Sequence, residues 1–264
     1  MVRGSLVGSG GRVVVVSPHL DDGVLSMGTT IARLARAGTP VEVLTVFAGD
    51  LGSAAPASGW DARGGFATEG AATAGRRAED REACRILGAR AVWLPFADGD
   101  YGRARDAGEV WSAVAEVVDG AETVLLPGFP LTNPDHAWLT SVLLARPLPV
   151  RRVGCYVEQP YTLWLSRGEL RGTPASSIEP ELGWEWLPGG CVDRWAKWRA
   201  IRAYRSQLPL LGRARRRGSS LARLLFSDVP HAGEALRWLP PASIEVVRGR
   251  TAAVAQSEVP GADG

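Results

Sequence analysis

The sequence predicts an α/β protein with a Rossmann-like, doubly wound, mainly parallel sheet, a long Trp-rich insertion and C-terminal helices. Five runs rich in β-branched residues are long enough for strands buried on both faces. They alternate with stretches whose apolar residues have helical spacing, which is typical of a parallel sheet with right-handed crossovers. A chain of 264 residues is ample for a hydrophobic core.

These runs and stretches give the predicted elements in order. The expected strands cover 12–17, 41–47, 91–96, 122–128 and 150–157. The expected helices cover 23–37, 70–87, 107–119, 136–145 and 193–207, with Gly88 as C-cap of the second. In a doubly wound sheet, ligands bind at the carboxyl ends of the strands. The polar residues that follow each strand are therefore the candidates for function.

We expect a single domain over residues 1–264, with its sheet core at 12–157. Residues 158–192 are rich in Pro, Gly and Trp and lack clear periodicity, which favours an insertion that acts as a lid. A C-terminal helical part is expected over 193–240 and a flexible tail over about 250–264.

Composition excludes several classes of partner. The net charge is +2 and the basic residues are scattered, except for RARRRG at 213–218, so no nucleic-acid partner is expected. The three cysteines form no CxxC pair, which favours a reduced, cytoplasmic setting. No apolar run of about 18 residues is present, so no membrane span is expected. No oligomeric state follows from these features.

The stretch VVVVSPHLDDG, residues 13–23, ends a predicted strand on His19, Asp21 and Asp22. One interpretation is that the aspartates only cap the following helix. Another is a receiver-like acidic pair that binds magnesium, but the only lysine, Lys197, falls after the predicted core strands. A third is a metal site, because His19 and Asp22 lie three residues apart across a tight turn and Asp21 could face a water.

A second cluster favours the metal interpretation. His136 stands in NPDH after the fourth predicted strand, with Pro134 at a natural helix start. A lone histidine there is more often a surface or core residue. Two His and Asp clusters at two strand ends, however, converge on one edge of a parallel sheet. The pairing indicates a divalent-metal site.

The same residues resemble a known family. SPHLDD and NPDH are similar to the P-H-x-D-D and H-x-x-H signatures of the PIG-L/LmbE-like de-N-acetylases. Three further segments resemble family motifs in the same order: RRAEDREACRILGA (76–89) its Arg-x-x-Glu helix, FADGDYG (96–102) its Leu-Pro-Asp-Gly turn, and KWRAIRAYRSQ (197–207) its Lys-x-x-Ala…Ser-Gln helix. Most of residues 12–207 is covered.

The resemblance implies a metal-dependent hydrolase that removes an acetyl group from an amino sugar. The implied ligands of Zn²⁺ or another divalent metal are His19, Asp22 and His136, and Asp21 is the implied general base on a water. Substrate contacts are implied for four residues whose alternative role is solvated surface charge. These are Asp50, in the long connection 48–70, and Arg76, Arg77 and Asp98.

One position departs from the family pattern, because Asn133 replaces the first histidine of H-x-x-H. An amide cannot donate a proton as an acid at neutral pH, although it can hydrogen-bond an oxyanion. The acid role then passes to Asp21 after it accepts a proton, or to His231 if the C-terminal segment folds back. Asn133 also motivates an alternative, a sugar-binding or accessory protein of this fold without turnover.

The Arg and Ala bias and the Trp-rich insertion resemble deacetylases of actinobacterial secondary metabolism, among them the glycopeptide-antibiotic pseudoaglycone deacetylases. The implied partner is an N-acetylglucosaminyl group on a bulky aglycone. Tryptophan normally belongs to cores, but four residues could stack on a sugar or aglycone: Trp138, Trp164, Trp184 and Trp186. An amidase acting on another N-acylated small molecule is a further alternative.

Overall fold

The computed structural model of the protein describes residues 10–164, 184–213 and 234–239. The strands are β1 (Val13–Ser17), β2 (Val41–Thr45), β3 (Arg90–Trp93), β4 (Thr123–Phe129), β5 (Arg152–Val157), β6 (Glu185–Trp186) and β7 (Ala235–Trp238). The helices are α1 (Asp22–Arg36), α2 (Gly59–Arg63), α3 (Glu69–Leu87), η1 (Gly99–Tyr101, a 3-10 helix), α4 (Ala107–Val118), α5 (Pro134–Leu144), α6 (Tyr161–Trp164), α8 (Cys191–Ile201) and α9 (Leu208–Arg213).

The described strands form one sheet in the order β3-β2-β1-β4-β5-β7-β6. The first five strands pair in parallel. β7 pairs antiparallel with both β5 and β6. Chain order reverses between β1 and β4, so that the sheet grows outward in both directions from this pair. The α/β, Rossmann-like and mainly parallel fold expected from the sequence is confirmed.

The four consecutive valines of β1 explain how the sheet is buried. Val13 and Val15 belong to one hydrophobic cluster, and Val14 and Val16 belong to a second cluster on the other face. All four are at most 1% exposed, because successive side chains of a strand point to opposite faces. The unbroken apolar run is therefore that of a central strand covered on both sides.

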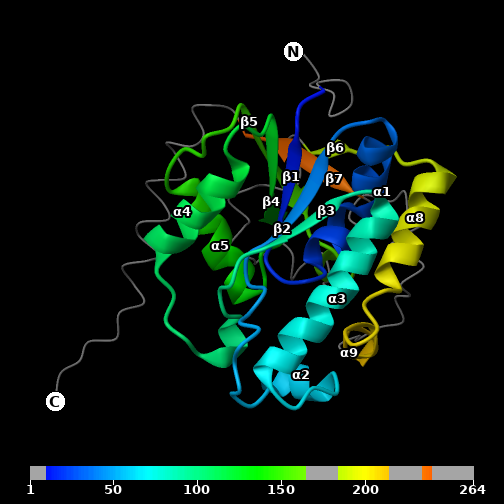
Figure 1. Ribbon diagram of the computed structural model, residues 1–264. Helices are drawn as coiled ribbons and strands as arrows, with labels where there is room; N and C mark the ends of the chain where they lie inside the picture. Colours follow the sequence, from blue (N-terminus) through cyan, green and yellow to red (C-terminus); the bar gives the residue numbers. More distant parts are fainter. Residues whose placement is uncertain (1–9, 165–183, 214–233, 240–264) are drawn as a thin grey trace.

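Helices cover both faces of the sheet (Figure 1). α1, α3 and α8 pack on the face of Val13 and Val15, and α4 and α5 pack on the face of Val14 and Val16. α1 and α8 lie side by side, as do α3 and α8, although α8 is distant from both in sequence. None of the described helices combines the length and apolar character needed to cross a bilayer.

The C-terminal part differs from the expectation. A helical part was expected over 193–240, and α8 and α9 are helical, but residues 235–238 form strand β7. The prediction is wrong for this segment because β5 offers a free strand edge, and ALRW pairs with it and buries Ala235 and Leu236. Most of the expected insertion (165–183) and the whole expected tail (250–264) lie outside the described residues.

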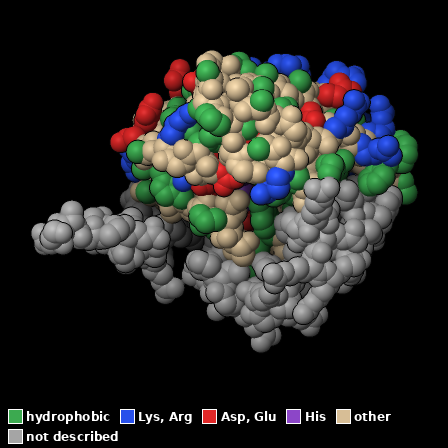
Figure 2. All heavy atoms as spheres, turned by 90° about the horizontal axis from the view of Figure 1, so that it is seen from below, with side chains coloured by type: hydrophobic (Ala, Val, Ile, Leu, Met, Phe, Trp, Pro, Cys, Tyr) green, Lys and Arg blue, Asp and Glu red, His purple; other side chains and the backbone are tan. Residues whose placement is uncertain are grey.

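The carboxyl ends of the five parallel strands meet at one edge of the sheet, at the bottom of the view in Figure 1. Figure 2 looks onto this face and shows acidic side chains beside basic ones near its middle. Burying or half-burying charged groups costs free energy unless they are paired or bind an ion. This edge therefore holds the candidate site.

Candidate active site

The turn between β1 and α1 carries the first group of site residues. The Ser17 hydroxyl donates to the His19 carbonyl (2.6 Å) and accepts from the Gly23 amide (2.8 Å), which fixes the turn. A Cβ atom on Gly23 would lie 3.2 Å from the Ser17 side chain, so a larger residue would fit here only if its neighbours moved. The Asp22 carboxylate accepts from the His19 backbone amide at 2.9 Å.

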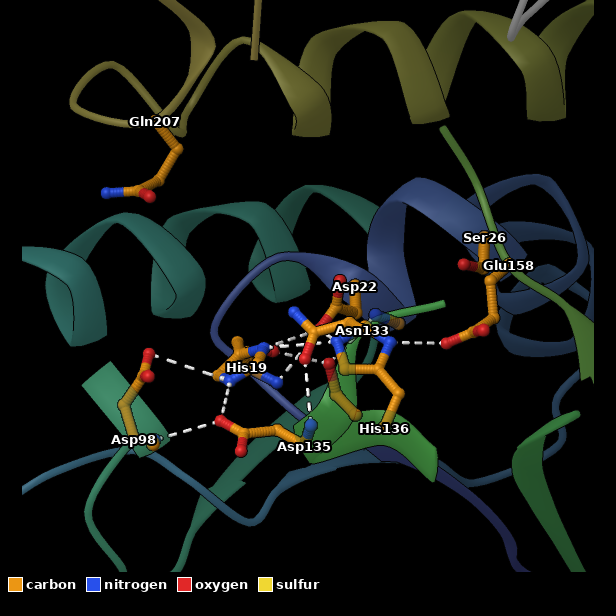
Figure 3. A network of polar contacts seen from close by, with 12 residues as sticks. His19, Asp22, Ser26, Asp98, Asn133, Asp135, His136, Glu158 and Gln207 are labelled. Atoms are coloured by element: carbon orange, nitrogen blue, oxygen red, sulfur yellow. Dashed lines mark hydrogen bonds and ion pairs between the residues drawn. The ribbon is translucent and has the colours of Figure 1, made fainter. Parts of the chain in front are cut away.

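Three side-chain atoms from two strand ends converge at one point (Figure 3). Asp22 Oδ2 lies 3.2 Å from His19 Nδ1 and 3.0 Å from His136 Nε2. The two imidazole nitrogens lie 3.1 Å apart. All three residues are buried, with exposures of 8% or less. The structure thus brings together the three residues for which the sequence implied a shared ion. They form one of the two groups among the described residues that could hold a metal ion.

A carboxylate lies on the far side of each imidazole ring. His19 Nε2 lies 3.1 Å from Asp135 Oδ2, and His136 Nδ1 contacts Glu158 Oε1. Carboxylates only accept hydrogen bonds, so each imidazole donates its N–H outward. When the rings are neutral, Nδ1 of His19 and Nε2 of His136 carry lone pairs that face one another and a carboxylate oxygen. This arrangement favours a positive charge between them, either protons on the rings or a metal ion.

These residues fit a divalent metal. Three atoms bound tetrahedrally to one zinc ion at its usual distances are about 3.3 Å apart, close to the separations of 3.0 to 3.2 Å found here. Two imidazoles and one carboxylate are a ligand set suited to zinc and to several other divalent metals. The outer carboxylates, Asp135 and Glu158, would orient the rings.

The electrostatics of the centre also favour a cation. Burial lowers the pKa of His136, but Asp22 and Glu158 outweigh burial and raise it to about 9. Burial likewise lowers the pKa of His19, but the carboxylates of Asp98, Asp135 and Asp22 outweigh burial and hold this pKa well above its ordinary value. In Asp22, burial favours the neutral form, but the two histidines lower the pKa far below its usual range. The point where His19, Asp22 and His136 converge therefore attracts positive charge, although these residues are buried.

Asp21 is buried beside this centre but does not cap the helix. It occupies the N-cap position of α1, yet its side chain accepts no capping hydrogen bond. The interpretation of Asp21 as a simple helix cap is therefore wrong. Burial and the neighbouring charge of Asp22 raise the pKa of Asp21 to about 7, against the opposing charges of Arg76, His19 and His136. A carboxylate with such a pKa suits proton transfer near neutral pH.

Asn133 has a clear structural role. It is the N-cap of α5, and its Oδ1 accepts from the Asp135 amide at 2.9 Å. Asn133 also hydrogen-bonds Tyr161, whose ring stands edge-on against His136 at 5.4 Å between centroids. The position that holds a histidine in the family pattern here holds the start of α5 in place.

A small cavity, partly open to solvent, lies next to the three converging residues. Arg76 and Asp98 both line it, and Asp98 Oδ2 lies 3.5 Å from His19 Nε2. Arg76 is 7% exposed, and within the described residues its Nε atom has no hydrogen-bond partner. The structure thus brings two of the four implied substrate residues to the centre.

Asp50 and Arg77 lie elsewhere. Asp50 is exposed and its carboxylate accepts from the Gly52 amide at 2.8 Å within its own turn. Arg77 donates to the carbonyls of Ala48 and Gly49 and stacks over the Trp93 ring. Neither residue is among those that line the cavity. Arg77 instead anchors the connection that follows β2.

The remaining predicted residues divide between core, surface and undescribed segments. His231 lies outside the described residues. Trp138 stacks against Phe47 at 6.1 Å and Trp184 against Phe129 at 6.2 Å, both next to buried clusters, whereas Trp186 is 43% exposed. Of Trp164 the structure gives only its place at the end of α6.

Sequence reasoning missed three carboxylates of the site: Asp61, Asp135 and Glu158. Glu158 directly follows β5, so the rule that located His19 and His136 would have found it, but the residue was assigned to the insertion. Asp135 stands inside the NPDH segment. Asp61 lies in the long connection after β2, far from any strand end, and no signal in the sequence marks it.

Comparison with known proteins identifies the family. The model of the PIG-L family, described as GlcNAc-PI de-N-acetylase, matches residues 14–146, about half of the chain. No protein with a curated function matches significantly.

Three solved structures are similar at 25% sequence identity, and the alignment covers 97% of each. They are a deacetylase–bog complex from teicoplanin biosynthesis (TM-score 0.67, 86% of this chain), a zinc-inhibited form of teicoplanin deacetylase (0.65, 86%) and the deacetylase of the A40926 pseudoaglycone (0.62, 87%). Together with the family match and the convergence of its motifs at one sheet edge, this places the chain in the PIG-L family of de-N-acetylases.

Proposed function

We propose that the protein is a metal-dependent de-N-acetylase that hydrolyses the acetamide of an N-acetylglucosaminyl group, carried by a secondary metabolite such as a glycopeptide-antibiotic pseudoaglycone. One observation carries the proposal: His19, Asp22 and His136 aim three ligand atoms at one point, and a buried carboxylate, Asp21, lies beside them without a capping role. The similarity to pseudoaglycone deacetylases supports the substrate class.

The three converging residues would hold a divalent ion such as Zn²⁺, with Asp135 and Glu158 fixing the imidazole rings. Such an ion supplies Lewis acidity, which polarises the acetyl carbonyl and lowers the pKa of a water to about 7. Because one similar deacetylase is described in a zinc-inhibited form, the native ion must be chosen by comparing zinc with cobalt, nickel and manganese.

Asp21 performs the proton transfers in this proposal. It takes a proton from the attacking water, whose oxygen bonds to the acetyl carbon. The C–N bond then breaks, and the proton passes from Asp21 to the leaving nitrogen, giving acetate and a free amine. Asn133 can donate a hydrogen bond to the oxyanion but cannot supply this proton, so one carboxyl group serves as base and then as acid.

Arg76 and Asp98 provide the substrate subsite. A sugar hydroxyl both donates and accepts hydrogen bonds, so it can accept from the unpaired N–H of Arg76 and donate to the Asp98 carboxylate. Asp50 lies on an exposed turn and Arg77 binds backbone carbonyls, so neither has a part in this subsite.

Two measurements test the proposal together. Metal analysis of the purified protein should find about one divalent ion per chain. A mass screen of glycosylated natural products should find a product that has lost one acetyl group, and acetate should appear in equal amount. If the metal is present and no product forms from any N-acetylglucosaminide, the hydrolase assignment fails.

A second candidate is a sugar-binding protein of the same fold without turnover, favoured by the use of Asn133 as a helix cap. It predicts retained metal and saturable sugar binding with no acetate release. A third is an amidase for another N-acylated small molecule, which predicts acid release from amides that lack a sugar. The same screen separates the three, provided that it includes thiol conjugates and simple N-acyl amines.

A further inference from the structure

The cavity beside the centre contains an ion pair that the proposed mechanism does not use. Asp61 Oδ1 accepts from Arg76 Nη1 at 3.1 Å, and Asp61 Oδ2 accepts from the Tyr101 hydroxyl at 2.7 Å. All three residues line the cavity. Asp61 is 3% exposed and Arg76 is 7% exposed, so this pair is withdrawn from solvent on both sides.

The chain holds Asp61 firmly in this place. Asp61 lies in the short helix α2, whose N-cap Ser58 accepts from the Asp61 amide at 3.2 Å. The preceding residue, Trp60, donates from its indole nitrogen to Gln207 at 2.6 Å. The long connection after β2 is therefore tied to the C-terminal helices, and its buried carboxylate faces the guanidinium from α3.

The charges around the cavity decide which ligand it can accept. An unpaired, buried arginine is a site for anions, since its fork of donors matches carboxylates and phosphates. Here Asp61 neutralises Arg76, and Asp98 adds a further negative charge to the lining. The Nε atom of Arg76 remains buried and without a partner among the described residues, so the arginine retains a donor but no excess charge.

We propose that Asp61 determines specificity in the substrate subsite: by pairing with Arg76, it makes the cavity accept a neutral hydroxyl and reject an anionic group. Tyr101 holds the carboxylate in position for this pairing. The inference rests on the proposed function, because it assigns the cavity to the sugar of the substrate. It adds that the sugar group bound in the cavity is uncharged. Specificity then arises from repulsion of an anionic ligand as well as from attraction of a neutral one.

The test compares two probes by binding, which needs no turnover. One is methyl N-acetyl-β-D-glucosaminide, and the other is its uronic acid analogue, in which a carboxylate replaces the hydroxymethyl group. The wild-type protein loaded with metal should bind the neutral probe at least tenfold more tightly. In Asp61→Asn this preference should fall about tenfold, because the anion meets one negative charge fewer and the freed guanidinium.

Two further variants separate specificity from stability. Asp193 of α8 is a matched control: like Asp61 it is a buried carboxylate paired with an arginine, Arg36, but it does not line the cavity. Asp193→Asn should keep the wild-type preference even if it lowers the melting temperature. Tyr101→Phe keeps the charge of Asp61 but loses the hydrogen bond that holds this carboxylate against Arg76, so the preference for the neutral probe should fall about threefold.

An unchanged preference in folded Asp61→Asn would overturn the inference. If that variant does not fold, an unchanged preference in Tyr101→Phe would overturn it instead. A wild-type protein that binds neither probe refutes the subsite, whether or not acetate is released from some other amide. Binding with the predicted preference but no acetate release from any substrate would refute the proposed hydrolysis and leave the role of Asp61 standing.

Discussion

At the scale of single residues, the centre depends on pairs in which one side chain sets the state of another. His19 and His136 each have a carboxylate on the side away from the point where they converge, Asp135 and Glu158 respectively. Glu158 also accepts from the amide of Leu131, which has a left-handed backbone with φ of 53°. One carboxylate thus orients a ring and stabilises a turn that most residues avoid.

Replacing Asp21 by Asn tests the proton-transfer role. The amide is nearly the same size but cannot accept a proton, so turnover should fall by roughly 10² to 10⁴. Metal content should be unchanged, because Asp21 is not one of the three converging ligands. Acetate release and metal analysis on the same sample measure both; wild-type turnover in this variant would refute the base assignment.

Replacing Glu158 by Gln tests the orientation of His136. Partners of this kind typically change metal affinity by about 10- to 100-fold, and we expect a loss in that range. Competition with a chromophoric chelator measures the dissociation constant. Glu82→Gln, at an exposed pair with Arg85 on α3, serves as the control and should bind metal as the wild type does. Equal affinity in the two variants would mean that Glu158 does not orient the ring.

Metal affinity should fall steeply as the pH falls. The imidazoles must lose their protons to bind an ion, and the carboxylates hold the pKa of His136 at about 9 and that of His19 above its ordinary value. Below these values protons compete with the ion, and affinity falls by up to about tenfold per pH unit for each proton displaced. Titrations between pH 6 and 8 measure this slope, and a flat profile would contradict the assigned ligands.

At the scale of elements, the ends of strands position the chemistry. His19 follows β1, His136 lies in the first turn of the helix after β4, and Glu158 follows β5, so three neighbouring strands of the sheet each contribute one residue. Asp98 approaches from the turn after β3 through the start of η1, where its side chain accepts from the Asp100 amide. Each of these side chains lies next to a strand or helix that holds its backbone in place, which favours a rigid site.

Gly99 shows how closely two of these turns meet. Its amide donates to Asp135 at 2.9 Å, and a Cβ atom would lie 2.5 Å from that carboxylate. Gly99→Ala should displace Asp135, remove its support for His19 and weaken metal binding about tenfold. Gly59→Ala is the control, because its Cβ would meet nothing closer than 3.9 Å. Unchanged metal affinity in Gly99→Ala would show that His19 does not need this support.

An element could be predicted from the sequence where its own residues carry a clear hydrophobic pattern. β1 to β5 were predicted within a few residues because buried parallel strands are continuous β-branched runs, and the rule for strand ends then located His19, Asp22 and His136. β7 was missed because four residues that pair with an existing edge carry no periodicity of their own. Asp61 was missed because only the folded connection brings it to Arg76.

At the scale of the whole molecule, one buried pair ties distant segments together. Lys197 of α8, the only lysine in the chain, donates to Glu234 at 2.7 Å, and both side chains are 5% exposed or less. Glu234 also accepts from the amides of Thr29 and Thr30 in α1. α1, α8 and the segment leading into β7 are thereby joined behind the sheet, on the face away from α4 and α5.

Lys197→Met should lower the free energy of unfolding by about 3 kcal/mol, because it leaves the Glu234 carboxylate buried without its cation. Urea denaturation of the metal-free protein measures this loss. Arg85→Met breaks the exposed pair with Glu82 and should leave the denaturation midpoint unchanged. Equal midpoints for the two variants would contradict the role given to Lys197.

The most direct test of the account measures acetate released from an N-acetylglucosaminyl pseudoaglycone by one preparation in three states: as purified, after chelation, and after chelation followed by one equivalent of divalent metal. The account predicts release in the first state, loss in the second and recovery in the third, with one acetyl group lost from the product mass. Release that survives complete removal of metal would contradict the central claim that His19, Asp22 and His136 form a catalytic metal site.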